Sequence, residues 1–332
     1  MSDDQQYPII DLSVYLNDPK NASTDCNMVA DLLHKYGFLC VKDPRVDDIH
    51  NKRFIDMLEK YYEQSDEEKA KDIHEEVFYQ VGLTSTYIER ARNHCDTIAK
   101  LDRTEKALSI CPPELDNKMR FFWRVGEAPS QKWKTIMDSW GKLMLESVLT
   151  VAQMCALGFG LPVDTFTSLM KYGPHLLAPT GSDLGRFGKE GTVLAGFHSD
   201  IGFLTIHGRA RFPGLFVWTR EGKRLAVKVS HGCLLLQAGK QFEWLTGGEV
   251  LAGFHEVIVS EKTVEVIDDA SKAGRSLWRV SSTMFTHIAS DEILKPLPTF
   301  ANSETLEKYS PMKAGAQVLA ELAAINMKKT LN

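Results

Sequence analysis

One short segment pairs an imidazole with a carboxylate at a spacing that suits metal binding. His198 and Asp200 lie two residues apart in the run Gly196-Phe197-His198-Ser199-Asp200, whose apolar residues predict a β-strand. Side chains at i and i+2 of a strand point to the same face, so both groups can reach one ion. The pattern therefore predicts two ligands of a metal site.

A third ligand must come from a neighbouring strand. His255 is the best-placed histidine, because it lies between the turn signal Gly247-Gly248 and the apolar run Val257-Ile258-Val259. Two imidazoles and one carboxylate on one face of an octahedral ion leave three positions open, which suits co-substrate and O₂ binding at iron(II). We therefore predict that His198, Asp200 and His255 bind iron.

The same spacing occurs a second time, at His94-Cys95-Asp96. That copy lies in residues 87–101, which read as helical, and residues two apart on a helix point to opposite sides. His207 is an odd number of residues from His198 and would face the other way if the strand continued, and His231 precedes a predicted turn. The remaining histidines are interpreted as structural or solvated: His34, His50, His74, His94, His175, His207, His231 and His287.

The candidate ligands lie in a part of the chain built from short apolar runs that glycines separate. Eight strand-like runs follow residue 172 at a spacing of roughly ten residues. They are residues 192–197, 203–206, 214–218, 225–229, 233–237, 256–259, 264–267 and 277–285. Such a series predicts a sandwich or a barrel of the jelly-roll kind.

Helices are expected around this core. Residues 47–71 are charged and periodic and predict a surface helix pair, with Ser65 as a helix-start signal. From residue 131 to about 157 apolar side chains recur every three and four positions, which predicts a long helix that ends at Gly158. A last helix is expected after Ser310-Pro311. Short strands are expected at 7–12 and 37–41, and residues 79–113 read as irregular.

Composition excludes several classes of protein. The chain has 332 residues, 43% of them hydrophobic, which is enough for a sizeable core. A formal net charge of −5 gives no sign of a nucleic-acid or anionic-membrane partner. The N-terminal residues lack the features of a signal peptide, and no apolar run approaches the roughly 18 residues that span a bilayer. We therefore expect a soluble, cytoplasmic protein that acts on a small molecule.

The cysteines are scattered along the chain without a C-x-x-C pair. This pattern argues against a disulfide framework and against a zinc ribbon. We therefore expect reduced, mostly buried thiols at Cys26, Cys40, Cys95, Cys111, Cys155 and Cys233.

Three segments in a fixed order carry a family resemblance. The first is residues 195–205, with 213–217 as its next strand, and the second is residues 245–257. The third, residues 279–285, contains Arg-x-Ser followed by a phenylalanine. In this order the segments resemble the isopenicillin N synthase-like family of iron(II)- and 2-oxoglutarate-dependent oxygenases. Residues 7–12 and 37–39 are similar to the family's N-terminal region, so the likeness covers most of the chain.

The resemblance implies a mixed α/β fold whose core is a double-stranded β-helix, or jelly roll. It implies Fe(II), 2-oxoglutarate and O₂ as cofactors and co-substrates, with Arg279 and Ser281 holding the C5 carboxylate of 2-oxoglutarate. One oxygenase domain, residues 1–332, is expected. Its parts are an N-terminal non-haem dioxygenase region (1–125), a long framing helix (126–162), a jelly-roll catalytic core (165–300) and a C-terminal helical segment (303–330).

The chain also departs from the family pattern. About 24 residues separate His255 from Arg279, more than is usual, so residues 268–272 are expected to lengthen a hairpin loop and Arg275 is a rival anchor. The family's asparagine and tyrosine pair is replaced by Lys171-Tyr172-Gly173, which leaves Tyr172 as a candidate 2-oxoglutarate contact. Glu256 stands where the family usually has an arginine.

The leading hypothesis is an oxygenase that hydroxylates or desaturates a small molecule and releases succinate and CO₂. Asp200 argues against a halogenase, in which a small residue replaces the carboxylate. The alternatives are an iron oxidase or cyclase that does not use 2-oxoglutarate, and a non-catalytic iron or 2-oxoglutarate sensor. Hydrolysis by an activated serine or a zinc helix has no support, because neither G-x-S-x-G nor H-E-x-x-H is present.

The sequence does not identify the substrate. The resemblance places the substrate pocket before the long helix and beside the iron. The candidate substrate-binding residues are Tyr79, Gln80, Arg90, Arg92, Phe203, Lys240 and Trp244.

Overall fold

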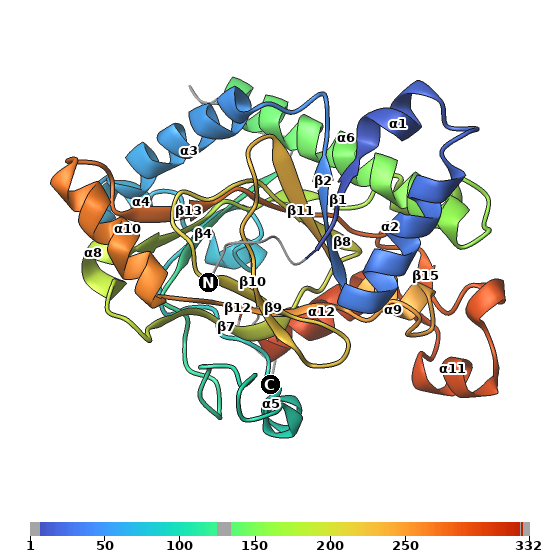
Figure 1. The fold of residues 1–332 in the computed structure, drawn as a ribbon. Coiled ribbons are helices and arrows are strands. Elements are labelled where there is room, and N and C mark those ends of the chain that lie inside the picture. The colour runs from blue at the N-terminus through green and yellow to red at the C-terminus, as the bar shows by residue number, and fades with distance from the viewer. Residues whose placement is uncertain (1–6, 125–133, 326, 328–332) are drawn as a thin grey trace.

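The computed structural model describes residues 7–124, 134–325 and 327. A broad β structure occupies the middle of the molecule, and helices surround it (Figure 1). The expected mixed α/β class is confirmed. Among the described residues, no helix has the length and apolar character needed to cross a membrane.

Two sheets build the core. The larger runs in the order β1-β2-β11-β8-β14-β5-β4-β6-β13, with β3 paired to β4, and the smaller runs β10-β9-β12-β7. The strands of the larger sheet are β1 (Ile9–Asp11), β2 (Phe38–Lys42), β3 (Gly82–Thr84), β4 (Met119–Arg124), β5 (Leu176–Leu177), β6 (Thr180–Asp183), β8 (Leu204–His207), β11 (Cys233–Ala238), β13 (Trp278–Ser281) and β14 (Thr283–Phe285). Those of the smaller sheet are β7 (Val193–Ser199), β9 (Leu215–Trp218), β10 (Arg224–Ala226) and β12 (Phe254–Ile258).

Alternation along the central strands separates an apolar face from a polar one. On β8, Leu204 and Ile206 pack into the main hydrophobic core, whereas Thr205 and His207 point the other way. The His207 ring lies 6.4 Å, between centroids, from that of His255 on β12 of the smaller sheet. At β8 the two sheets therefore enclose polar groups, while the apolar residues of this strand face the helices.

Helices pack on the apolar face of the larger sheet. The long helix α6 carries Met144, Val148 and Val151 into the main core and packs against α2 (Figure 1). The helices are α1 (Leu12–Asn17), α2 (Ser23–Tyr36), α3 (Asp48–Tyr62), α4 (Asp66–Ala70), α5 (Cys95–Lys100), α6 (Lys134–Gly158), α7 (Thr165–Met170), α8 (Leu184–Phe187), α9 (Lys240–Leu245), α10 (Glu261–Lys272), α11 (Ser303–Lys308) and α12 (Ala314–Ala324), with short 3₁₀ turns at Glu75–Val77 and Pro298–Phe300.

Most predicted elements are confirmed. The charged pair is α3 and α4, and the hydroxyl of Ser65 accepts a hydrogen bond from the Glu68 N–H at 3.3 Å. The long helix ends at Gly158 as expected, whereas its predicted start at residue 131 lies outside the described residues. The short strands predicted near the N-terminus are β1 and β2, which pair in parallel.

One predicted strand is wrong. Residues 264–267 lie in helix α10, so the extra residues 268–272 form helix and not a longer hairpin loop. Ser260 and Thr263 form a capping box at its start, and Val264 and Ile267 pack against a small core cluster. A short apolar run such as this one is compatible with a strand or a helix, and its apolar residues recur at helical spacing. The capping box at Ser260 therefore indicates the helix.

The last helix begins later than predicted. Helix α12 starts at Ala314, and its N-cap residue Lys313 makes no side-chain cap. Met312–Lys313 instead forms strand β16, which pairs with β15 (Ile293–Leu294). That pairing holds the chain extended beyond Ser310-Pro311 and delays the helix.

The prediction that all cysteines are reduced is also wrong. Cys95 and Cys111 are joined by a disulfide, with their Cα atoms 5.7 Å apart. The other four cysteines, Cys26, Cys40, Cys155 and Cys233, are free and buried, as expected. Sixteen residues separate the bonded pair without any spacing motif, so only the folding back of this segment brings them together.

The carboxylate of Glu256 fixes this folded-back segment. It is fully buried on β12 and accepts hydrogen bonds from the N–H groups of Leu108 at 3.1 Å and Ser109 at 3.2 Å. The Ser109 hydroxyl donates to Glu256 at 2.9 Å and accepts from the Phe197 N–H at 2.7 Å. Arg224 lies 3.5 Å from the carboxylate. Glu256 therefore ties the segment to both β12 and β7.

Replacing Glu256 with alanine should lower the free energy of unfolding by about 3 kcal/mol, because buried donors and a cation would lose their acceptor. Urea denaturation followed by circular dichroism measures this change. The control is Glu265→Ala on α10, whose side chain is 61% exposed and which should change stability by less than about 0.5 kcal/mol. Equal losses in the two variants would contradict the role assigned to Glu256.

Candidate active site

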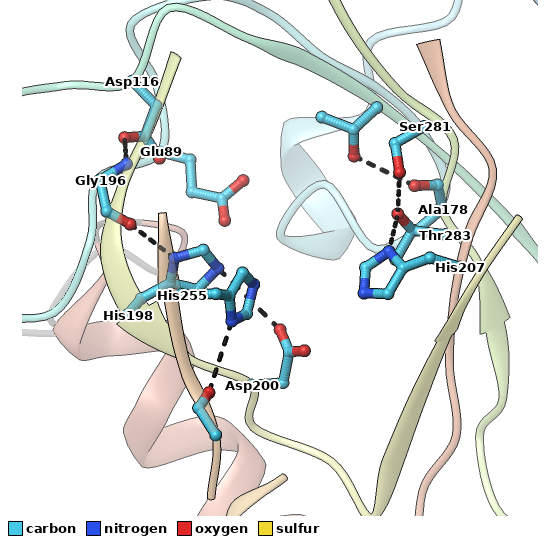
Figure 2. Close-up of polar contacts among 12 residues, drawn as sticks. Glu89, Asp116, Ala178, Gly196, His198, Asp200, His207, His255, Ser281 and Thr283 are labelled. Carbon is cyan, nitrogen blue, oxygen red and sulfur yellow. Dashed lines mark hydrogen bonds and ion pairs between the residues drawn. The ribbon is translucent and has the colours of Figure 1, made fainter. Parts of the chain in front are cut away.

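The register of two strands brings the predicted ligands together. β12 pairs antiparallel with β7, and His255 lies directly opposite His198. Asp200 follows β7 by one residue. One ligand atom from each of His198, Asp200 and His255 lies within 4.8 Å of the others (Figure 2). The three residues that the sequence singled out therefore form one cluster.

Backbone carbonyls orient both imidazoles. His198 Nδ1 lies 2.6 Å from the Gly196 carbonyl oxygen, and His255 Nδ1 lies 3.4 Å from that of Gly253. A carbonyl can only accept, so Nδ1 carries the proton and Nε2 keeps its lone pair. Nε2 of His198 lies 4.0 Å from Oδ1 of Asp200. His198 thus presents Nε2 toward the carboxylate, and one ring nitrogen of His255 lies within 4.8 Å of it, as expected of metal-binding histidines.

The charges of the cluster favour a divalent cation. Burial, reinforced by His255, holds the pKa of His198 well below its usual value, so the ring is neutral. Burial alone would raise the pKa of Asp200, but His255 and His198 outweigh it and keep the pKa below its usual value. The oxygen Oδ2 of Asp200 is buried without a hydrogen-bond partner among the described residues. A neutral His198 ring, a second imidazole on the adjacent strand and an ionised carboxylate with an unused oxygen fit Fe(II).

A group of polar side chains lies inside the barrel beside this cluster. His207 Nδ1 lies 3.0 Å from Thr283 Oγ1, which is 3.0 Å from Ser281 Oγ (Figure 2). Nε2 of His207, both amide atoms of Gln237 and the hydroxyl of Thr205 are buried and have no hydrogen-bond partner in the part of the chain that the structure describes. So many unmatched buried groups in one place indicate the binding site of a polar ligand.

Sequence analysis missed His207, Gln237, Thr205 and Thr283. The prediction for His207 assumed that the strand of His198 continues to residue 207. His207 instead lies on a different strand, β8, so its distance along the chain from His198 does not decide which way its side chain points. Gln237 and Thr283 lie opposite β8 in the larger sheet, paired with Thr205 and His207 respectively. The alternation Leu204-Thr205-Ile206-His207 was the signal that could have revealed this polar face.

Arg279 is a buried cation without an anionic partner among residues 7–124, 134–325 and 327. Its side chain lies on β13, 7% exposed, and Nε donates to the Pro213 carbonyl at 3.2 Å. Burial lowers its pKa to about 10, so the guanidinium is still charged at neutral pH. Arg279, Asp200 and His255 are the charged or ionisable neighbours of His207. The polar interior therefore extends from the metal ligands toward Arg279.

The rival anchor Arg275 lies elsewhere. It is exposed and lines surface grooves with Lys52 and Arg211. Tyr172, the other candidate contact with 2-oxoglutarate, is also misplaced: its side chain is 87% exposed at the end of α7, and its φ of 64° turns the chain there. Neither residue can serve the buried interior.

A cavity opens beside His198 and Asp200. Four of the predicted substrate residues line it: Gln80, Arg90, Arg92 and Lys240. Three others do not. Phe203 is fully buried between Phe166 and Phe242, Trp244 packs on Tyr309, and Tyr79 packs behind the cavity wall. These three aromatic side chains pack against other apolar or aromatic residues and do not line the cavity, as is common for large aromatic residues.

The cavity has one ionic wall that sequence analysis also missed. It is made by Glu89, Asp116, Lys118 and Arg120, which are all buried. Three of them lie in or just before β4, far along the chain from the metal ligands, and no local pattern marks them. Ser199, His287 and Glu321 also line the cavity. Its large apolar side chains are Phe122, Leu176, Ile201, Phe285, Val318, Leu322, Ile325 and Met327.

Comparison with solved structures shows the same fold. A full-length protein from Neurospora crassa, solved in complex with alpha-KG, aligns over 98% of both chains with a TM-score of 0.76 and 17% identity. A 2OG-Fe(II) oxygenase family protein from Caulobacter crescentus aligns over 96% of this chain and 98% of its own, with a TM-score of 0.70 and 19% identity. JOX2, solved with 2OG, Fe and JA, aligns over 95% and 84%, with a TM-score of 0.71 and 16% identity. The predicted jelly-roll core is confirmed.

Comparison of the sequence with family models gives the assignment. No curated protein matches the chain. Residues 166–288, which contain all three candidate ligands and Arg279, match the model described as the 2OG-Fe(II) oxygenase superfamily. The expected cofactors, Fe(II) and 2-oxoglutarate with O₂, agree with this match. Over residues 166–288 the chain is therefore similar to the 2OG-Fe(II) oxygenase superfamily, and this similarity supports its assignment as a non-haem iron(II)- and 2-oxoglutarate-dependent dioxygenase.

Proposed function

We propose that this enzyme hydroxylates or desaturates a small organic molecule in the cavity beside His198 and Asp200. In hydroxylation, one oxygen atom of O₂ enters a C–H bond of the substrate, and the other enters succinate as 2-oxoglutarate loses CO₂. The observation that carries the proposal is the His198–Asp200–His255 cluster, which adjoins both this cavity and a polar interior that ends at Arg279.

His198, Asp200 and His255 are proposed to hold the iron. The two imidazoles offer Nε2 because Gly196 and Gly253 fix their Nδ1 protons, and Asp200 supplies the negative charge. When bound, iron(II) supplies the site at which O₂ and 2-oxoglutarate react. The protein positions these partners and keeps a single carboxylate at the metal, so that open positions are left for them.

Arg279 and Ser281 are proposed to hold the distal carboxylate of 2-oxoglutarate. A buried guanidinium without a partner is unfavourable, and a carboxylate would satisfy it with paired hydrogen bonds. His207, Gln237 and Thr205 offer unused donors and acceptors in the same interior, and Arg279 and Asp200 are both neighbours of His207. This arrangement favours use of 2-oxoglutarate over the alternative of an oxidase or cyclase that dispenses with it.

The cavity is proposed to bind the substrate. It borders two of the iron ligands and combines apolar side chains with a few polar and charged groups, which is the composition typical of small-molecule sites. Proteins of the same fold act on or bind small ring compounds and acids: the Neurospora crassa protein was solved with thymine, JOX2 with JA, and a rice dioxygenase serves auxin oxidation. The cavity lies beside metal ligands that leave open positions for O₂ and 2-oxoglutarate. A substrate bound there would lie next to the metal, which supports catalysis over a purely sensory role.

The first test removes the iron ligands. His198→Ala, Asp200→Ala and His255→Ala should each abolish stoichiometric iron binding, because two remaining donors compete poorly with water for a labile divalent ion. Metal analysis after anaerobic reconstitution with iron(II) measures the bound iron. His94→Ala is the control: it belongs to the other His-x-Asp pair, lies at the N-cap of α5, and should leave iron content unchanged. Full iron occupancy in a ligand variant would refute the assignment.

The second test concerns the anchor for 2-oxoglutarate. Charge-assisted hydrogen bonds contribute roughly 1.5–3 kcal/mol each, so Arg279→Ala should weaken 2-oxoglutarate binding by tens-fold or more. Arg279→Lys should recover only part of the loss, because an ammonium group lacks the planar fork. Anaerobic titration followed by the iron charge-transfer absorbance gives the affinity.

Arg275→Ala is the matched control for this titration, because it removes an arginine that is exposed. It should bind 2-oxoglutarate as the parent protein does. If Arg279→Ala binds 2-oxoglutarate as tightly as the parent protein, Arg279 is not the anchor. That result would favour the alternative of an iron oxidase or cyclase that does not use 2-oxoglutarate.

A further inference from the structure

We propose that Glu89 determines substrate specificity. Its free carboxylate oxygen accepts a hydrogen bond from an N–H or O–H group of an uncharged, compact ring compound, and its charge excludes substrates that carry a carboxylate at that position. The inference rests on the proposed function, because it takes the cavity beside His198 and Asp200 as the substrate site.

The ionic wall binds Glu89 through one oxygen alone. Arg120 donates to Oε1 at 2.8 Å, and Lys118 Nζ lies 3.4 Å from the same atom. Lys118 also pairs with Asp116 Oδ2, while Asp116 Oδ1 accepts from the Gly196 N–H at 2.9 Å. Every other carboxylate oxygen of this wall has a partner. Oε2 of Glu89 is buried and has none among the described residues.

Glu89 is an ionised acceptor. Burial alone would raise its pKa, but Arg120 and Lys118 outweigh burial and hold the pKa below its usual value. The side chain is 10% exposed, so water screens it little. A buried anion with an unused oxygen in a ligand cavity calls for a donor from the ligand. In Figure 2 Glu89 lies beside Asp116, on the side of the cluster that carries Gly196 and His198.

The cations in the cavity are engaged, which disfavours an acidic substrate. Lys118 and Arg120 pair with the two acids of the wall, and Arg92 and Lys240 both pair with Glu321 on α12. Arg90 is exposed, where solvent and salt weaken its attraction for an anion. A substrate carboxylate placed against Glu89 would meet like charge in a poorly solvated site.

The rest of the lining fits a flat, largely apolar body. The guanidinium of Arg120 lies between two rings, with its carbon 5.7 Å from the centre of Phe122 and 5.2 Å from that of Phe285. Leu176 and Leu322 belong to the same apolar cluster. A ring compound can pack against this wall while a ring N–H or hydroxyl reaches Glu89.

Matched pairs of ligands test the inference by equilibrium binding. The probes are uracil with 1,3-dimethyluracil, indole with 1-methylindole, and phthalimide with N-methylphthalimide, together with benzoate and 2-naphthoate as acids that carry no N–H. Dissociation constants are measured by ligand-observed NMR on protein loaded with zinc(II), with and without 2-oxoglutarate. Among the pairs that bind, the N–H member should bind at least about ten-fold more tightly than its methylated partner, and the acids should bind more weakly than either.

Glu89→Gln should abolish the preference for the N–H member. The glutamine oxygen will face Arg120 and Lys118, so its NH₂ group will face the cavity as a donor. Asp116→Asn is the matched control: it removes the same charge from the same wall, but both oxygens of Asp116 are already used, so the preference should remain. Circular dichroism checks that each variant is folded, and if Glu89→Gln is not, the ligand series on the parent protein decides.

Two outcomes would overturn the inference: acids that bind as tightly as the N–H probes, or an N–H preference that survives in Glu89→Gln. Failure of the proposed function shows separately, as absence of 2-oxoglutarate binding. The probe affinities measured without 2-oxoglutarate still report on Glu89 in that case.

Discussion

The pairing of β7 with β12 is the constraint on which the site depends. Because His255 lies directly opposite His198, two imidazoles project from adjacent strands toward the same point, and Asp200 joins them two residues on. A shift of one residue in this register would turn His255 to the other face of the sheet and leave one imidazole beside the carboxylate. The metal site is therefore a property of strand register before it is a property of any side chain.

Glu256 and its partners protect that register. The carboxylate follows His255 on β12, faces the opposite side, and binds a segment that also reaches Phe197 on β7 through Ser109. One face of these strands thus carries the ligands, and the other is held by buried hydrogen bonds. The hydrogen bonds of Glu256 and Ser109 on one face of the strands therefore help to hold the metal ligands on the opposite face.

Buried charge is distributed unevenly around the cluster. The ionic wall compensates itself, since two acids meet two bases and a single oxygen is left over among the described residues. The interior toward Arg279 is not compensated, because its guanidinium has no anionic partner among the described residues. The proposed anionic co-substrate would complete the second region, whereas the first is proposed to disfavour an anion. The two regions therefore suit chemically different ligands on two sides of one metal site.

Sequence alone predicted the three residues that cluster, a buried arginine, the fold class and most strands and helices. Local patterns carry this information, since a two-residue spacing fixes a shared face on a strand and apolar periodicity fixes an element. Tertiary structure decided the rest. A capping box decided that residues 264–267 form helix and not strand. The Cys95–Cys111 disulfide depended on a segment that Glu256 holds folded back. The polar interior around His207 depended on which strands became neighbours. Glu89 and Lys118 reach the metal site through contacts between distant segments, which no local spacing encodes.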